Sequence, residues 1–274
     1  MLRGGLFPHP PIIIPEIGGE RRQKAAETIA ASKKLAGIFA KHKPDLVVAA
    51  GPHGPTDHSR ITISAARDYR GDLGYFGAPD IKFTLEGCPE LAAEIKQEFV
   101  SAGWQLRQVN HQKSGAELDH GIMVPLYFLE EAGLERVPWL ILNMTFWDPE
   151  KLYDFGKKLA DYLKKESEFT DPVFLVSGDL SHRTEPGAPG GYSPAGEKFD
   201  RQLMGLLAEG DLDAILKLDQ QLIKDAGECG YRPLLIGLGF SEKLAGKGEL
   251  DIEVLSYEAP FGVGYGVAQF RDRR

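Results

Sequence analysis

The sequence predicts an α/β fold, in which one layered domain holds a central mixed sheet with helices on both faces. Short apolar runs of strand length alternate several times with longer stretches whose apolar residues recur at helical spacing. The chain has 274 residues, a length at which an α/β fold can form one unit. Because no repeat, low-complexity tract or linker interrupts the pattern, we expect a single domain over residues 1–274.

The predicted strands are mostly short and apolar, which is typical of strands buried inside a sheet. We expect them at residues 2–7, 45–50, 60–66, 104–110, 137–144, 172–177, 249–257 and 264–270. A hairpin-like excursion is also expected over residues 60–77.

The predicted helices have apolar residues near a spacing of 3.6, with charged residues between them. We expect them at residues 19–41, 89–102, 123–131, 148–165, 193–207, 212–222 and 231–245. The helix at 148 begins with Asp148 as N-cap and Pro149 at the first helical position. The loop 183–193 is rich in glycine and proline, and it is either a lid beside a site or a plain surface connection.

Charge and composition exclude several classes of protein. The chain has 32 Lys and Arg against 40 Asp and Glu, a net charge of −8, which argues against nucleic-acid binding. No apolar run approaches the ~20 residues of a membrane span. Two cysteines, Cys88 and Cys229, are too few for a disulfide framework. We therefore expect a cytoplasmic protein that handles a small molecule, and a homo-oligomer, since most soluble oligomers are symmetric.

The positions of the histidines indicate a functional site. His9, His53 and His182 each follow a predicted buried strand, and prolines frame the first two. In open α/β sheets ligands bind beyond the carboxyl ends of the strands, where three such imidazoles can meet. His120, beside Asp119, is a fourth candidate. The other three histidines are expected to lie at the surface or to have no function; they are His42, His58 and His111.

Neutral imidazoles bind zinc, copper, iron or nickel. Two histidines and one carboxylate with open positions form the site of non-heme Fe(II) enzymes that activate oxygen. Further histidines would then serve as general acids or bases. Four residues are candidates for the carboxylate. Glu228 precedes a predicted helix and Glu258 ends a predicted strand, while Asp179 and Asp57 are weaker candidates.

The order of these motifs resembles the class III extradiol ring-cleavage dioxygenases, the LigB-like superfamily. That superfamily also includes DOPA-dioxygenase-like enzymes and Memo-like proteins, among them members associated with the AmmeMemoRadiSam group. The resemblance extends from His9 to about Phe270. It rests on Pro-His-Pro-Pro from Pro8, Gly-Pro-His-Gly-Pro from Gly51, Asp-His-Gly from Asp119 and Ser-Gly-Asp-Leu-Ser-His from Ser177.

The resemblance implies a single α/β domain that binds Fe(II) through His9, His53 and Glu228. It places the catalytic acid or base on His182, and it implies that His120 contacts substrate or oxygen. Asp179 would orient the loop or a histidine. Some branches of the superfamily carry zinc or replace the glutamate by histidine or cysteine, so Cys229 is a further ligand candidate.

The implied activity is the oxygen-dependent opening of a catechol-type aromatic diol, with a role in aromatic catabolism. Phe7, Tyr192 and Tyr231 are candidates for aromatic walls, with core packing as the alternative. Arg232 is a candidate for binding a substrate carboxylate. Two other functions stay open, namely a Memo-like binding or regulatory protein without ring cleavage and a zinc-dependent hydrolase.

Overall fold

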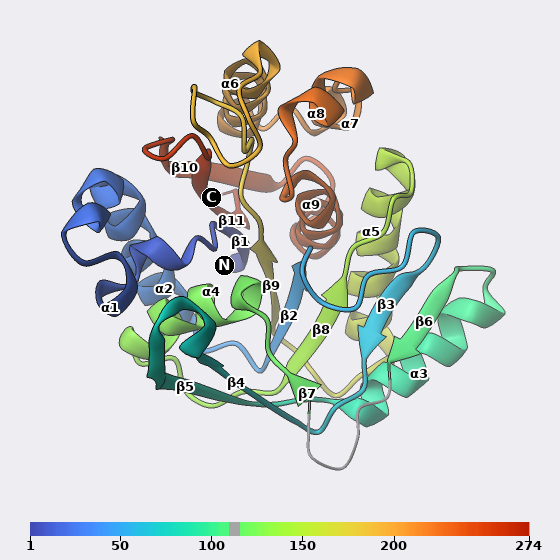
Figure 1. Cartoon of the computed structure of the whole chain (residues 1–274). Coiled ribbons are helices and arrows are strands. Elements are labelled where there is room, and N and C mark those ends of the chain that lie inside the picture. The colour runs from blue at the N-terminus through green and yellow to red at the C-terminus, as the bar shows by residue number, and fades with distance from the viewer. Residues whose placement is uncertain (110–115, 274) are drawn as a thin grey trace.

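The computed structural model describes residues 1–109 and 116–273. Its central element is an eight-stranded mixed sheet in the order β10-β11-β1-β9-β2-β8-β3-β6 (Figure 1). The strands are β1 (Leu2–Phe7), β2 (Leu46–Gly51), β3 (Ile61–Ser64), β6 (Leu106–Val109), β8 (Trp139–Asn143), β9 (Pro172–Ser177), β10 (Leu250–Glu258) and β11 (Tyr265–Asp272). The strands β1, β9, β2 and β8 are parallel, whereas β3 and β11 pair antiparallel with their neighbours β8 and β1. The predicted mixed sheet is confirmed.

Helices cover both faces of this sheet. They are α1 (Pro15–Gly18), α2 (Ala26–His42), α3 (Pro89–Ser101), α4 (His120–Glu131), α5 (Pro149–Glu166), α6 (Pro194–Glu209), α7 (Leu212–Leu216), α8 (Gln220–Ala226) and α9 (Tyr231–Ala245). In Figure 1, α2 and α4 lie on one side of the strands, and α9, α5 and α3 lie on the other. Of the helices described, none combines the length and apolar character that crossing a membrane requires.

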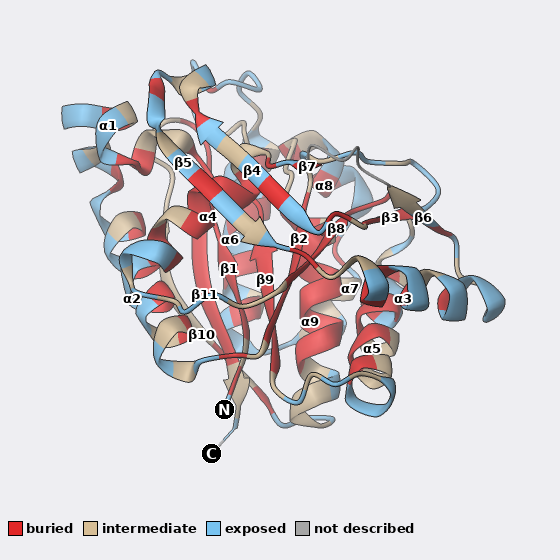
Figure 2. Ribbon diagram, turned by 90° about the horizontal axis from the view of Figure 1, so that it is seen from below, coloured by how far each residue is buried: buried red, intermediate tan, exposed pale blue. Residues whose placement is uncertain are grey.

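Strand β2 shows why the central strands are apolar along their whole length. Successive side chains of a strand point to opposite faces of the sheet. Val48 and Ala50 belong to the core shared with α5 and α9, whereas Val47 and Ala49 belong to the core shared with α2 and α4. Figure 2 shows the central strands buried. Burial on both faces explains the runs from which the sequence predicted these strands.

The hairpin expected over residues 60–77 differs from the structure, because part of this segment belongs to a second, three-stranded sheet. It has the order β5-β4-β7, with β4 (Asp68–Leu73), β5 (Ala78–Glu86) and β7 (Ala116–Glu117). The hairpin joins β4 to β5 through the turn η3 (Gly74–Phe76), and β3 instead enters the main sheet beside β8. All four residues of β3 are buried, which suits the main sheet, whereas β4 and β5 alternate buried and exposed residues (Figure 2).

Three predicted helices differ from the structure at their ends. Residues 19–25 form the 3₁₀ segment η2 (Gly19–Ala25), so α2 begins later than expected. The helix expected at 212–222 is two helices, because the Asp219 side chain accepts the N–H of Gln221 at 2.8 Å and starts α8 afresh. Helix α4 begins at His120, three residues earlier than expected, which places this histidine on the first turn of a helix.

Helices α5 and α9 pack closely because glycines lie at their contact. A Cβ added to Gly156 of α5 would lie 2.0 Å from the carbonyl oxygen of Ile236 in α9. A Cβ added to Gly239 of α9 would lie 2.0 Å from the carbonyl oxygen of Tyr153. Both obstacles are backbone atoms of the other helix, so neither can rotate away.

We predict that Gly156→Ala lowers the free energy of unfolding by about 1–3 kcal/mol, because α5 and α9 must move apart. The matched control is Gly205→Ala in α6, where an added Cβ has no neighbour within 4 Å. This control should be neutral or stabilising by up to about 1 kcal/mol, the helix propensity difference. Urea denaturation followed by circular dichroism measures both. Equal effects of the two substitutions would contradict this account of the helix contact.

Candidate metal centre

Three histidines from separate parts of the chain meet at the carboxyl edge of the main sheet. His9 follows β1, His53 follows β2 and His120 begins α4. One ring nitrogen from each lies within 4.8 Å of the others. The ring centroids are 4.7 Å apart for His9 and His53, 4.2 Å for His53 and His120, and 5.4 Å for His9 and His120. This group, the three-histidine cluster, has the size of a metal site.

Ser177, the last residue of β9, sets the proton position on His9. The hydroxyl of Ser177 donates to the carbonyl oxygen of Gly121, so its oxygen is left to accept a hydrogen bond. Nδ1 of His9 lies 2.9 Å from that oxygen and therefore carries the ring proton. Nε2 of His9 is then unprotonated, and its lone pair points into the cluster. His9 itself is only 2% exposed.

Nε2 of His53 lies 2.9 Å from Nε2 of His9. Since the His9 nitrogen is an acceptor, this approach needs either a proton on His53 or a cation shared by the two rings. Ligand nitrogens at about 2.0–2.1 Å from a metal ion lie about 3 Å from each other when adjacent. The spacing of the two nitrogens therefore fits a pair of metal ligands.

Burial keeps the cluster uncharged. It lowers the pKa of His9 well below its ordinary value, and the neighbouring histidines lower it further. Burial and then the charge of His120 lower the pKa of His53 to about 4, although Asp119 acts in the opposite direction. Burial also lowers the pKa of His120. All three imidazoles are neutral at pH 7, which is the form that binds metal ions.

A thiol and a carboxyl group lie on the buried side of the cluster. Sγ of Cys229 is 3.7 Å from Nε2 of His9, and burial raises the pKa of this thiol. Oδ2 of Asp179 is 3.9 Å from the same nitrogen, and its Oδ1 accepts the backbone N–H of His9 at 2.9 Å. Burial, followed by the charge of Asp200, raises the pKa of Asp179 to about 7. His9 is thus held from both its backbone and its ring.

Glu228 lies next to Cys229 in sequence but outside the three-histidine cluster. Its carboxylate accepts the backbone N–H of Tyr231 at 2.6 Å and a guanidinium N–H of Arg232 at 3.3 Å. It therefore ties down the first turn of α9. The assignment of Glu228 as a metal ligand stays a prediction.

The other carboxylate candidates bind elsewhere in the chain. Glu258 accepts the backbone N–H of Thr28 at 2.7 Å, which joins β10 to α2. Asp57 accepts hydrogen bonds from Ser59 and Arg60 within its own loop. Of the four candidates, Asp179 is the one with a carboxylate oxygen within 4 Å of a cluster nitrogen.

His182 lies in the loop after β9. Its Nδ1 lies 2.7 Å from the carbonyl oxygen of Gly227, so Nδ1 carries the proton and Nε2 is free to accept one. The loop is held by Ser181, whose hydroxyl donates to Ala226 and whose N–H donates to Asp200. A charge on His182 would lower the pKa values of both His9 and His53.

A cavity of about 270 Å³ opens beside His53, between the main sheet and the small sheet. It is lined by His53, Gly54, Pro55, Ser64, Tyr69, Glu117, Leu118, Asp119, Ile122, Ile141 and Asn143. We call it the His53 cavity. Phe76, in the turn between β4 and β5, packs edge-on against His120, with ring centroids 5.4 Å apart.

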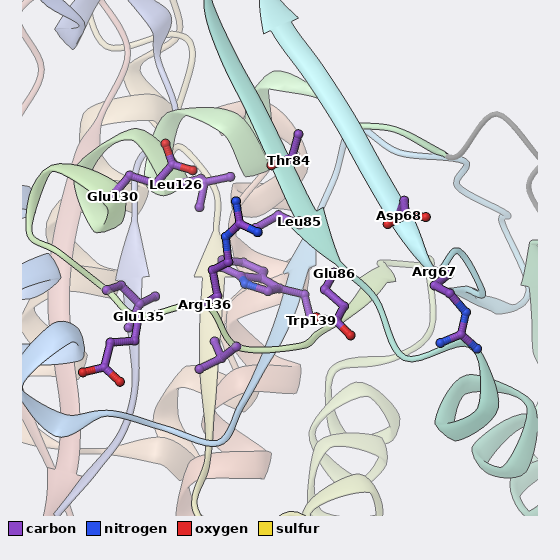
Figure 3. Close-up of a pocket in the computed structure, with 12 residues that line it drawn as sticks. Arg67, Asp68, Thr84, Leu85, Glu86, Leu126, Glu130, Glu135, Arg136 and Trp139 are labelled. Carbon is purple, nitrogen blue, oxygen red and sulfur yellow. The ribbon is translucent and has the colours of Figure 1, made fainter.

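Figure 3 shows another hollow, of about 320 Å³, around Trp139 at the first residue of β8. It lies at the opposite edge of the sheet from His53. Charged side chains of both signs surround it, including Arg67, Arg136 and Glu130, and none of its twelve lining residues is a histidine or cysteine. The three-histidine cluster lies instead at the carboxyl edge.

The remaining sequence candidates have other surroundings. Phe7 packs edge-on against Phe39 in the core, and the buried Tyr231 donates its hydroxyl to Ile215, so these two aromatic residues serve the core. Tyr192 is exposed. His42 lies 3.1 Å from Asp171, and His58 stacks on Phe146. His111 lies outside the described residues.

The family profile described as the catalytic LigB subunit of aromatic ring-opening dioxygenase matches residues 4–268. Protein CA_C1420 of Clostridium acetobutylicum is 34% identical over 271 residues, which are 96% of this chain and 56% of that protein. A MEMO1 family protein of Metallosphaera sedula is 24% identical over 206 residues, which are 74% of this chain and 62% of that protein. The chain therefore spans less than two thirds of the length of both relatives.

A solved structure has a similar fold. It is that of the uncharacterized protein JW3007 from Escherichia coli K12, with a TM-score of 0.58 and 16% sequence identity. The similarity covers 86% of this chain and 91% of that protein. At this identity the likeness concerns the fold alone.

We predict that replacing any one of His9, His53 or His120 by alanine weakens metal binding by about a hundredfold or more. Even groups that only orient a ligand contribute about 10–100-fold, and Ser177→Ala should fall in that lower range. Elemental analysis after anaerobic loading with Fe(II) or zinc and desalting measures the bound metal. His58→Ala is the control and should retain it. Full metal content in His53→Ala would refute this ligand set.

We also predict that His53 lowers the stability of the metal-free protein as pH falls from about 6.5 to 4. The unfolded chain binds protons on its histidines in this range, whereas folded His53 does so only near pH 4. His53→Gln should therefore lose less free energy of unfolding between these pH values. Asp179 and Asp200, whose raised pKa values act with the opposite sign, are common to both proteins. Identical pH dependence of the two proteins would contradict the pKa of His53.

Proposed function

Because the chain belongs to the family of the catalytic LigB subunit of aromatic ring-opening dioxygenases, we propose that it opens the ring of a catechol-type diol with O₂. The observation that carries this proposal is the three-histidine cluster at the carboxyl edge of the sheet. Its rings are neutral at pH 7, and a cavity opens beside it. Such a site can bind a metal ion and a small organic molecule together.

The residues fit a resident metal ion. His9, His53 and His120 would hold it, and the thiol of Cys229 and the carboxylate of Asp179 lie near enough to His9 to be further donors. The geometry favours His120 over Glu228 as the third ligand, because the Glu228 carboxylate is bound to the start of α9. We propose Fe(II), with zinc as the alternative, since both accept imidazole. A bound Fe(II) supplies the redox chemistry that lets O₂ react with a diol.

His182 is the proposed base for the diol. Its Nδ1–H is fixed on the carbonyl oxygen of Gly227, so its Nε2 can take a proton from a hydroxyl group of the diol. The same ring can later return that proton. Its place on a short, hydrogen-bonded loop keeps it close to the cluster without making it part of the cluster.

The His53 cavity is the proposed place for the aromatic ring. Leu118, Ile122 and Ile141 form apolar walls, and each of these side chains is buried. These walls exclude water from the ring and leave the two hydroxyl groups to face the cluster. Polar side chains also line the cavity and can orient a ligand; they are those of His53, Ser64, Tyr69, Glu117, Asp119 and Asn143.

We predict that His182→Ala retains bound metal and loses about a hundredfold or more in turnover, the usual contribution of a general base. Oxygen uptake with simple catechols, measured on protein reconstituted with Fe(II) without oxygen, gives the turnover. Elemental analysis of the same sample gives the metal. His58→Ala should behave like the unsubstituted protein. Unchanged oxygen uptake by His182→Ala would remove His182 from the mechanism.

A second function is a metal-binding or regulatory protein without ring cleavage. The MEMO1 family relative favours it, as does the thiol of Cys229 beside His9, because thiolates are strong ligands for zinc and copper. Iron-loaded protein that takes up no oxygen with any of a broad range of catechols would support this second function over the first.

A further inference from the structure

Building on the proposed function, we propose that the His53 cavity selects aromatic diols with a short cationic substituent, such as an amine, and rejects those with a carboxylate. The shape of the cavity and the charges that line it favour such a ligand.

The cavity has room for one ring and a short substituent. Its volume of about 270 Å³ lies just below the ~300–1,000 Å³ of common ligand pockets. His53 belongs both to the cavity lining and to the three-histidine cluster. The two hydroxyl groups of the diol would therefore lie at the end of the cavity nearest to His53. Residues of β3, β4 and β8 also line the cavity, and its small volume leaves no room for a long substituent.

Among the described residues that line the cavity, two are charged at pH 7, and both are acidic. Glu117 is exposed at its rim on β7, and the half-buried Asp119 directly precedes His120. None of the eleven lining residues is a lysine or arginine. A ligand carboxylate placed between these two side chains would meet like charges, whereas an ammonium group would meet opposite charges.

Arg232, the candidate from the sequence for binding a substrate carboxylate, interacts with other groups of the protein. Arg232 donates to the buried Glu228, and its guanidinium group lies 4.7 Å from the centre of the Phe146 ring. It is not among the residues that line the His53 cavity. The net charge of −8 adds to the repulsion of anionic ligands over longer distances.

Binding can be measured apart from catalysis. The protein is loaded with zinc and titrated without oxygen against dopamine, ethylcatechol and dihydroxyphenylacetate, which share one ring and differ in substituent charge. Isothermal titration calorimetry gives the affinities. We expect dopamine to bind about tenfold or more tightly than dihydroxyphenylacetate, with ethylcatechol between them, as a charge pair near a protein surface contributes about this much.

Two variants assign the selectivity to the cavity. Glu117→Gln should reduce the ratio of the dopamine and dihydroxyphenylacetate affinities about fivefold. Glu131→Gln, an exposed residue at the end of α4 outside the cavity, should leave the ratio unchanged. Asp119 is left unchanged in this test because it adjoins His120.

The outcomes separate this inference from the proposed function. If dihydroxyphenylacetate binds most tightly, or if Glu117→Gln leaves the ratio unchanged, the selectivity is refuted while ring cleavage still stands. If no diol binds to fully loaded protein, the proposed function is refuted, and the selectivity with it.

Discussion

The parallel pairing of β1, β9 and β2 is the constraint on which the site depends. Parallel neighbours end at the same edge of a sheet, so the residues that follow them arrive together although they are far apart in sequence. The register pairs Phe7 of β1 with Ser177 of β9. This pairing brings the Ser177 hydroxyl to the ring of His9 and so determines which nitrogen of that ring is free.

The close approach of Gly178 and Gly230 brings Cys229 near the three-histidine cluster. A Cβ added to Gly178, directly after β9, would lie 2.2 Å from the Cα of Gly230 at the start of α9. Any side chain there would push the start of α9 away from the strand. The contact places Sγ of Cys229 3.7 Å from Nε2 of His9. The carboxylate of Glu228 instead accepts hydrogen bonds from Tyr231 and Arg232.

The sequence alone predicts the main sheet and two of the three clustered histidines. The central strands are apolar throughout because both faces are buried, and His9 and His53 directly follow such strands. The sequence also identifies His120 as a residue of the site, but not as a ligand beside His9 and His53, because the residues around Gly121 give no sign that α4 begins at His120. The sequence also could not tell whether Glu228 or Cys229 faces the cluster. The position of the residues before α9 determines which of the two side chains lies near the cluster, and this position depends on the contact of Gly230 with Gly178 after β9.

Crystallography with anomalous scattering at the iron absorption edge tests the central claim most directly. The crystals would be grown without oxygen from protein loaded with Fe(II), and the signal would locate the ion without reference to activity. We predict a single strong peak bounded by the ring nitrogens of His9, His53 and His120. A peak elsewhere in the molecule, or none in fully loaded protein, would contradict the account.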